Sequence, residues 1–426
     1  MQAIIKPGKI QGTIQAPASK SMMQRACAGA LLHDGETIIH HPGNSRDDIA
    51  AISIIQQLGA KITNQTEDIL EISSNGINPV ADSINCGESG LSARLFSAIA
   101  ALSNKSIQIR GEGSLLKRPM VGFDKVFSQL GVQLPDFNGQ IPFTIKGPLH
   151  PQSISLDASL SSQFLSGLLF ALSYAAKEPL TINVSNLKSK PYVDLTLDVL
   201  NHFDRPIVND NYQRFLIDPA QFEKKQKIEI EIEGDWSGAA NWLVAGCIAG
   251  TPVTITGLNL ESKQADKRIL DLLQIAGAIP DIKNDRITIE KTSLQEFEFD
   301  ATDCPDLFPI LSILAACTEG ESYIHGLHRL FHKESNRAES IGEMLQQFEV
   351  PYSIEDDSLC ITGTETFPAA TIDSYNDHRI VMAASIGALR TKGTVIINEA
   401  EAVDKSYPDF FRHFVSARAE CILNKD

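Results

Sequence analysis

Small and apolar side chains recur at helical spacing in the stretch 18–32, where Met22, Ala26 and Ala30 are four residues apart. This spacing predicts a helix with one buried face. A polar opening followed by a helix of small apolar residues then returns at intervals of 68 to 77 residues. The six predicted helices occupy residues 18–32, 88–102, 158–175, 235–249, 303–317 and 376–389.

A second helix is predicted in each interval, after a polar turn and a β-branched strand. These second helices begin near Asp47, Arg118, Lys190, Gln264, Asn336 and Ser406. A fixed period over a whole chain is the signature of a repeated supersecondary unit. We therefore expect an α/β fold made of six βαβαββ repeats.

The two ends of the chain suggest how the repeats close into domains. After the last predicted helix, at 408–419, too few residues remain for two closing strands. Two extended runs lie within 2–14, and we expect both to complete the sixth repeat. Repeats one to three would form one domain, 15–227, and repeats four to six the other, 1–14 with 228–426. The chain would cross between them twice, as a double-crossover hinge; a linear solenoid without closure is the alternative.

The composition narrows the class of protein. The chain has 426 residues, enough for two or three domains with cores of their own. A formal charge of −16 argues against nucleic acid or an anionic membrane as a partner. No apolar run is long enough to span a membrane and the start does not resemble a signal peptide, so we expect a cytoplasmic protein.

Cysteine and histidine spacing favours neither disulfides nor a metal centre. The seven cysteines contain no Cys-x-x-Cys pair, which is typical of reduced thiols in a cytosol. The ten histidines form no His-x-x-x-His helix face, so we predict no metal site. We also expect a monomer, because the repeats already cover one another.

Charged residues gather at the starts of the predicted helices. A single charge there is ordinarily a solvated cap, but ten basic residues at equivalent places are harder to explain that way. If the helix N-termini of both domains face one cleft, they would bind a ligand with several negative charges. The basic residues are Lys20, Arg25, Arg94, Lys117, Arg118, Lys190, Lys333, Arg337, Arg379 and Lys405, and the neighbouring acids are Asp47, Asp48, Asp235, Asp306, Glu334, Asp377 and Asp409.

The interleaved acids suggest proton transfer in addition to binding. Nearby cations lower the pKa of a carboxylate, so we expect Asp306 or Glu334 to be ionised and able to act as a base. Lys20 and Lys405, crowded by other cations, are expected to have lowered pKa values and to donate protons. Structural roles stay open: Asp306 as the N-cap of the helix that follows it, and Glu334 as the partner of a nearby Lys or Arg.

Eight short motifs at these positions carry a family resemblance. They are Ser19-Lys20-Ser21 with Arg25, Lys117-Arg118-Pro119, Ser161-Ser162-Gln163, Ser189-Lys190-Pro191-Tyr192, Pro305-Asp306, Lys333-Glu334 with Arg337, Asn376-Asp377-His378-Arg379, and Tyr407-Pro408-Asp409. Together, in order and over nearly the whole chain, they resemble the EPSP synthase (3-phosphoshikimate 1-carboxyvinyltransferase) family. The resemblance implies a two-domain inside-out α/β barrel with three βαβαββ repeats in each domain.

The family's reaction moves the enolpyruvyl group of phosphoenolpyruvate onto the 5-hydroxyl of shikimate 3-phosphate and releases phosphate, with no metal or organic cofactor. By resemblance, Asp306, Glu334, Lys20 and Lys405 would be catalytic. The implied contacts of shikimate 3-phosphate are Lys20, Ser21, Arg25, Ser161, Ser162, Gln163, Ser189, Tyr192, Asp306 and Lys333. Those of phosphoenolpyruvate are Lys20, Gly90, Arg118, Gln163, Arg337, Arg379 and Lys405.

One motif departs from the family pattern beside the expected phosphoenolpyruvate contacts. Where the family usually has Gly-Asn-Ala-Gly-Thr-Ala-x-Arg, this chain has an acid at Glu88 and a bulky apolar residue at Leu91. Nearby, Gln24 replaces the family's usual Asn, a milder change. We expect Glu88 and Leu91 to alter phosphoenolpyruvate affinity.

Two other functions compete with this one. The related enolpyruvyl transferase that acts on UDP-N-acetylglucosamine carries a Cys in the mobile loop that corresponds to 113–119, and this chain has none there. A catalytically altered homologue, or a repeat protein that only binds phosphorylated ligands, is favoured by Glu88 alone. The acids Asp306 and Glu334 argue against it, because buried negative charge weakens a pure anion binder.

Overall fold

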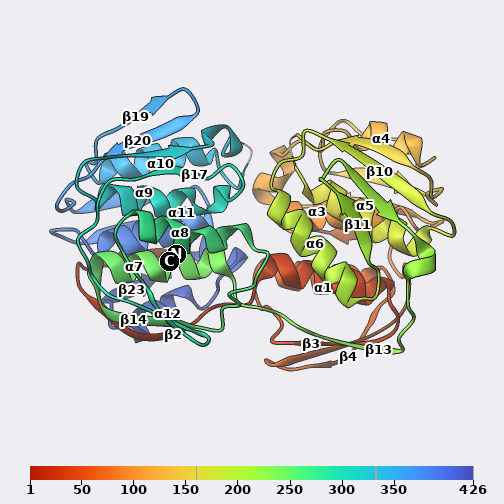
Figure 1. Cartoon of the computed structure of the whole chain (residues 1–426), viewed down its shortest axis with the longest axis horizontal. Coiled ribbons are helices and arrows are strands. Elements are labelled where there is room, and N and C mark those ends of the chain that lie inside the picture. The colour runs from red at the N-terminus through yellow and green to blue at the C-terminus, as the bar shows by residue number, and fades with distance from the viewer. Residues whose placement is uncertain (160, 332, 426) are drawn as a thin grey trace. The chain divides into compact units, whose positions relative to one another are not determined.

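The computed structural model describes residues 1–159, 161–331 and 333–425. The chain divides into two compact units, and both are traced by colour in Figure 1. Unit 1 comprises Met1–Pro17 and Gly234–Asp426, and unit 2 comprises Ala18–Glu233.

Unit 2 holds the first three repeats. The first contains α1 (Lys20–Leu32), β3 (Asp34–His40), α2 (Arg46–Gln57), β4 (Lys61–Gln65) and β5 (Ile69–Asn75). The second contains β6 (Ser83–Asn85), α3 (Gly90–Ala100), β7 (Ser106–Arg110), the 3₁₀ turn η1 (Gly113–Lys117), α4 (Phe123–Gln129) and β8 (Phe143–Lys146). The third contains β9 (Ile154–Asp157), α5 (Gln163–Ala175), β10 (Leu180–Ser185), α6 (Lys190–His202), β11 (Ile207–Asp210) and β12 (Arg214–Ile217), and is followed by η2 (Pro219–Gln221) and β13 (Lys227–Glu231).

Unit 1 begins with β1 (Gln2–Ile5) and β2 (Ile10–Gln15) and resumes with the fourth repeat: α7 (Trp236–Ala249), β14 (Gly250–Thr256), η3 (Ala265–Arg268), α8 (Ile269–Ile275), β15 (Asp281–Lys283) and β16 (Arg286–Ile289). The fifth contains β17 (Glu298–Asp300), η4 (Pro305–Leu307), α9 (Phe308–Ala316), β18 (Glu321–His325), η5 (Leu327–Arg329), α10 (Arg337–Gln347), β19 (Tyr352–Glu355) and β20 (Ser358–Thr362). The sixth contains β21 (Ala370–Asp373), α11 (His378–Ala388), β22 (Val395–Asn398), η6 (Ala400–Lys405), α12 (Phe410–Ser416) and β23 (Cys421–Asn424).

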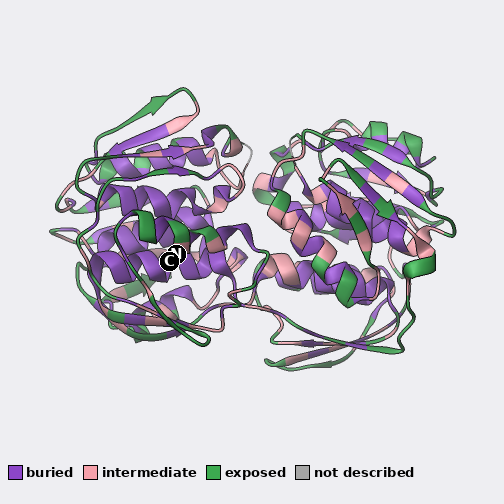
Figure 2. Ribbon diagram, in the orientation of Figure 1, coloured by how far each residue is buried: buried purple, intermediate pink, exposed green. Residues whose placement is uncertain are grey.

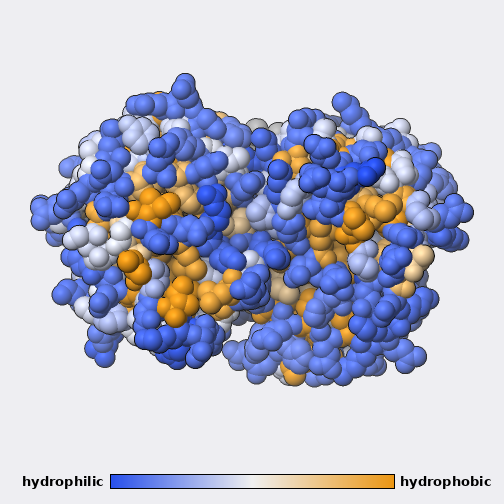
Figure 3. All heavy atoms as spheres, in the orientation of Figure 1, coloured by the Kyte–Doolittle hydropathy of each residue, from blue (hydrophilic) through white to orange (hydrophobic). Residues whose placement is uncertain are grey.

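The first helix of each repeat is the most deeply buried element of that repeat. In unit 2, α1, α3 and α5 contact one another, and in unit 1 the same is true of α7, α9 and α11. Every residue of α7 and α9 is buried, as their colouring in Figure 2 shows. Small side chains allow this close helix packing, and the sheets lie around it. The viewed face of each unit in Figure 3 carries mainly hydrophilic side chains.

The polar openings of four of the six predicted helices act as N-caps. Ser19 accepts a hydrogen bond from the backbone N–H of the third helical residue of α1, and Ser89 does the same for α3. The Asp235 carboxylate caps α7 and the Asp377 carboxylate caps α11. A side-chain acceptor at this place satisfies a backbone donor that the helix leaves unpaired.

Three of the second helices start later than the sequence predicts. The helices expected near Arg118, Gln264 and Ser406 begin at Phe123, Ile269 and Phe410. Prolines at 119 and 408 explain the first and third delays, because a proline disfavours helical backbone in the residue before it. In both of these places a 3₁₀ turn, η1 or η6, ends at a lysine directly before the predicted start, whereas η3 leads directly into α8.

The N-terminal strands do not both join the sixth repeat. Strand β1 lies between β22 and β23, so the C-terminal tail supplies one closing strand and β1 the other. Strand β2 instead pairs in parallel with β14 of the fourth repeat. The expectation was wrong for β2 because hydrophobic alternation does not reveal which sheet edge a strand will join.

The pairing of strands β13 and β2 places both boundaries between the units later in the chain than we expected. Strand β13 directly precedes α7 of unit 1 but pairs in parallel with β3 of unit 2, just as β2 precedes α1 and pairs with β14. Each crossing strand therefore completes a sheet of the unit that the chain is leaving. The crossings lie at 17/18 and 233/234, a few residues beyond the expected 14/15 and 227/228.

Candidate functional site

Arg25 is the centre of a polar cluster in unit 2. Its guanidinium donates to Thr196 Oγ1 at 2.8 Å and to the backbone carbonyls of Ser21 at 2.7 Å and Tyr192 at 3.1 Å. The side chain is buried, and burial lowers its pKa to about 10. In the part of the chain that the structure describes, no carboxylate pairs with Arg25. A buried cation whose protein contacts are all neutral is suited to an anionic ligand.

Lys20, the first residue of α1, lies beside this cluster. Its Nζ is 3.0 Å from Asp47 Oδ2, and both side chains are largely buried. Asp47 belongs to the first turn of α2, where the helix dipole favours a carboxylate. Asp47 therefore holds Lys20 at the start of α1.

Gly90 brings two guanidinium groups to the start of α3. A Cβ at Gly90 would lie 2.8 Å from Arg118 Nη1 and 2.9 Å from Arg94 Nη1, so a side chain there would displace both guanidinium groups. Arg94 also donates to Gln163 Oε1 at 3.2 Å and to the carbonyl of Pro119 at 2.9 Å. Gly90, Arg118 and Gln163, which the resemblance assigns to phosphoenolpyruvate, are thus neighbours within unit 2.

The predicted serine contacts lie at helix starts of the same unit. Ser162 precedes α5, and Ser161 Oγ accepts from the backbone N–H of Gln163 at 3.1 Å. Ser189 precedes α6 with left-handed backbone, at φ 54°, and its side chain makes no capping hydrogen bond to that helix. Tyr192 lies in the first turn of α6 and reaches Arg25 through its carbonyl.

Leu91, which follows Gly90, is an apolar residue of the hydrophobic core of unit 2 and is 7% exposed. Gln24, also buried, accepts hydrogen bonds from Ser89 Oγ at 3.0 Å and Ser92 Oγ at 2.9 Å. These contacts tie α1 to the start of α3, so Gln24 positions one helix against another.

Asp306 is the centre of a second cluster, in unit 1. Its Oδ1 is 3.1 Å from Lys333 Nζ and 2.9 Å from Arg337 Nη1, and its Oδ2 is 2.8 Å from Arg379 Nη2. Burial alone would raise the pKa of Asp306, but the three cations outweigh it and hold the pKa well below the usual 3.8. Asp306 lies within η4, and the helix that follows has no side-chain cap, so the N-cap interpretation was wrong.

Arg337 joins three carboxylates in this cluster. It is fully buried and donates to Asp377 Oδ2 at 2.9 Å, to Asp306, and to Glu334 Oε2. Burial by itself would lower the pKa of Arg337. The charges of Asp377, Glu334 and Asp306 outweigh this effect and raise the pKa above its usual value. The proposed Glu334 pair with a nearby Arg is therefore present, although Glu334 precedes α10 and the pair is not within the helix.

Lys405 ends η6 and is buried at the start of α11. Its Nζ donates to the carbonyl of Asn376 at 2.6 Å. Asn376 precedes Asp377, which caps α11 and accepts from the backbone N–H of Arg379 at 3.0 Å. Ion pairs thus connect five residues of the unit 1 cluster: Asp306, Lys333, Glu334, Arg337 and Arg379. Lys405 lies beside Asn376, the residue that precedes Asp377.

Two buried acids near these clusters carried no assigned role in the sequence. Burial, together with the charge of Asp306, raises the pKa of Asp266 to about 6. Asp266 accepts from Ser237 Oγ in the first turn of α7. Burial likewise raises the pKa of Asp48, next to Asp47, to about 7. Asp266 lies two residues after the helix start predicted at Gln264, where a single acid is ordinarily a solvated cap, so it did not stand out in the sequence. Asp48 was visible only as one acid among several.

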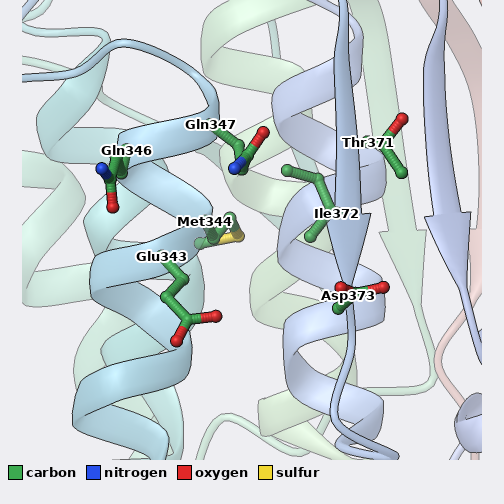
Figure 4. A pocket seen from close by; sticks show the side chains of 7 residues that line it. All are labelled: Glu343, Met344, Gln346, Gln347, Thr371, Ile372 and Asp373. Carbon is green, nitrogen blue, oxygen red and sulfur yellow. The ribbon is translucent and has the colours of Figure 1, made fainter.

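A groove between α10 and β21 lies apart from both clusters. It has a volume of about 240 Å³, and Figure 4 shows its lining residues: Glu343, Met344, Gln346 and Gln347 on the helix, and Thr371, Ile372 and Asp373 on the strand. None of the predicted site residues lines it. Throughout the described ranges, no group of His, Cys, Asp and Glu side chains could hold a metal ion. Those ranges also hold no helix long and apolar enough to cross a membrane.

Solved structures share this fold along the entire chain. EPSP synthase from Acinetobacter baumannii superposes with a TM-score of 0.85 at 24% identity, covering 100% of both chains. The enolpyruvyl transferase NikO from Streptomyces tendae gives 0.75 at 16% identity, covering 99% of this chain and 98% of the other. The fold is that of the enolpyruvyl transferases, which confirms the predicted two-domain α/β architecture.

Sequence comparison specifies the family. The EPSP synthase (3-phosphoshikimate 1-carboxyvinyltransferase) family model matches residues 4–414. A 3-phosphoshikimate 1-carboxyvinyltransferase of Clostridium novyi is 33% identical over 419 residues, 96% of each chain. One from Clostridium acetobutylicum is 35% identical over 411 residues, 96% of this chain and 95% of the relative. The chain belongs to the EPSP synthase family.

Proposed function

We propose that this protein transfers the enolpyruvyl group of phosphoenolpyruvate to the 5-hydroxyl of shikimate 3-phosphate and releases phosphate. Family membership over residues 4–414 supports this reaction, a step of the shikimate pathway to chorismate and the aromatic amino acids. Both substrates are small multiply charged anions, and they repel each other unless cations surround them. We expect the protein to carry out this reaction as a monomer.

The unit 2 cluster is suited to hold the substrates. Arg25, buried among neutral partners, has the unmatched positive charge that a phosphate needs, and Ser161, Ser162 and Ser189 offer hydroxyl donors at helix starts. Arg118 and Arg94, which converge beside Gly90, would hold the phosphoenolpyruvate anion.

The observation that carries the proposal is the contact of the Asp306 carboxylate with Lys333, Arg337 and Arg379 at 2.8–3.1 Å. Three cations hold its pKa well below the usual value against the effect of burial, so Asp306 is an acceptor at neutral pH. A hydroxyl that donates to Asp306 is oriented for attack, and it releases its proton as the new C–O bond forms. A site that only bound anions would gain nothing from this carboxylate.

Glu334 and the two lysines are assigned to proton transfer at the methylene carbon. Protonation of that carbon creates a cationic centre at the neighbouring carbon, which the hydroxyl then attacks, and loss of a proton with departure of phosphate completes the transfer. Glu334 is in contact with Arg337, and Lys20 with Asp47. These partners fix the positions of a proton acceptor and a proton donor.

Phosphate release with each substrate omitted in turn tests the proposal. We expect release only when phosphoenolpyruvate and shikimate 3-phosphate are both present. UDP-N-acetylglucosamine serves as the control acceptor and should give none. Phosphate release with that acceptor would favour the sibling transferase, and no release with any acceptor would favour a protein that only binds phosphorylated ligands.

A further inference from the structure

Glu88 precedes α3, and its carboxylate lies over the start of η1. Oε2 accepts a hydrogen bond from the backbone N–H of Ser114 at 3.2 Å. Gly113 has left-handed backbone, at φ 52°, and a Cβ there would overlap the Glu88 carboxylate. The carboxylate therefore occupies the space that a side chain at 113 would fill.

Further hydrogen bonds hold the same two segments together. The backbone N–H of Glu112 donates to the carbonyl of Gly87 at 2.7 Å, and Asn85 Nδ2 donates to Glu112 Oε1 at 2.8 Å. η1 has no side-chain cap from its own preceding residue, Glu112. Glu88 supplies this acceptor from a segment 26 residues earlier.

η1 in turn carries Arg118. The backbone N–H of Arg118 donates to the carbonyl of Leu115 at 3.1 Å, and its Nη2 donates to Ser114 Oγ at 3.4 Å. Displacement of Ser114 would therefore move both the backbone and the guanidinium of Arg118. That guanidinium approaches the position above Gly90.

We propose that Glu88 is a positioning residue for Arg118: it accepts the Ser114 N–H, fixes η1, and so sets the phosphoenolpyruvate affinity of the site. The proposal rests on the proposed function. It makes the opposite prediction to a purely electrostatic role, in which the negative charge of Glu88 would repel phosphoenolpyruvate. Glutamine separates the two, because it keeps an oxygen acceptor and removes the charge.

Steady-state kinetics of Glu88→Ala and Glu88→Gln test the proposal. We expect Glu88→Ala to raise the KM for phosphoenolpyruvate about tenfold, as for loss of a hydrogen bond to a charged group, with the KM for shikimate 3-phosphate unchanged. Glu88→Gln should stay within about threefold of the wild type. An unchanged KM in Glu88→Ala, or a KM more than about threefold lower in Glu88→Gln, would overturn the proposal. Absence of turnover in the wild-type protein would instead overturn the proposed function.

A matched control and a substrate-free measurement complete the test. Asp136 also holds a loop of unit 2, by accepting the Thr144 N–H at 2.6 Å, and Asp136→Ala should leave the KM for phosphoenolpyruvate unchanged. Hydrogen exchange at the Ser114 amide should accelerate at least about tenfold in Glu88→Ala and remain slow in Glu88→Gln. Equal exchange in all three proteins would contradict the proposed contact. If Glu88→Ala does not fold, Glu88→Met must raise the same KM, because methionine keeps the length of the side chain but offers no oxygen acceptor to the Ser114 N–H.

Discussion

Asp306→Asn removes one negative charge from a group of cations without changing the size of the side chain. Asp306 contacts Lys333, Arg337 and Arg379 at 2.8–3.1 Å. In the variant, less negative charge offsets the electrostatic repulsion among these three cations. Two effects should follow: unit 1 should become less stable, and its cations should bind anions more tightly.

The size of the stability loss follows from the geometry. Loss of one partner from a buried ion pair costs about 3–5 kcal/mol. Asp306 retains 22% exposure and Arg337 keeps Asp377 and Glu334, so the lower end applies. A loss of about 3 kcal/mol lowers the Tm of a unit of this size by about 6–12 °C.

The lowered pKa of Asp306 predicts how its contribution to the stability of the fold changes with pH. The folded-state pKa of Asp306 is lowered, because the cations outweigh the effect of burial. Its contribution to stability is therefore complete above the unfolded pKa of about 4 and is lost as the pH falls through the lower folded pKa. The Tm difference between the wild type and Asp306→Asn should be constant between pH 5 and pH 8 and narrow only in more acidic solution.

Calorimetric unfolding with and without inorganic phosphate measures both effects. Asp281→Asn is the matched control, because Asp281 pairs with Lys283 at an exposed place where an ion pair is worth at most about 1 kcal/mol. Phosphate should raise the Tm of Asp306→Asn more than that of the wild type, while kcat falls. If Asp306→Asn has the wild-type Tm at pH 7, or gains no more from phosphate, the reasoning about this cluster is refuted.

Three further predictions concern other groups of the two clusters. Lys20→Met and Glu334→Gln should each lower kcat at least about a hundredfold, since acid–base groups contribute about this much. Circular dichroism should show that both variants are folded, and a wild-type rate in either variant would remove that residue from the mechanism. Arg25→Lys should raise the KM for shikimate 3-phosphate at least about tenfold, because a lysine ammonium group lacks the planar guanidinium geometry that reaches Thr196 and two carbonyls together. An unchanged KM would show that the phosphate of this substrate binds elsewhere. Burial raises the pKa of Asp48 to about 7. The free energy of unfolding of the wild type should therefore fall as the pH rises from 4 to 7, and that of Asp48→Asn should not show this loss. Parallel plots of the two unfolding free energies against pH would contradict this prediction.

The sequence by itself determined the repeat and much of the chemistry. Six helices of small apolar residues were visible because helical periodicity is a local property of the chain. The polar residue before each helix was visible for the same reason, and Ser19, Ser89, Asp235 and Asp377 are N-caps as their residue types favour. The family resemblance came from residues at these helix starts.

Tertiary structure alone decided which strands pair and which charges meet. Strands β2 and β13 join sheets of the unit that the chain is leaving, and no local pattern distinguishes one sheet edge from another. Asp306 meets Arg379 across 73 residues of sequence, and Glu88 caps a turn 26 residues away. Such pairs depend on where whole elements pack. The sequence therefore fixes the inventory of charges, and packing determines which charge each one neutralises.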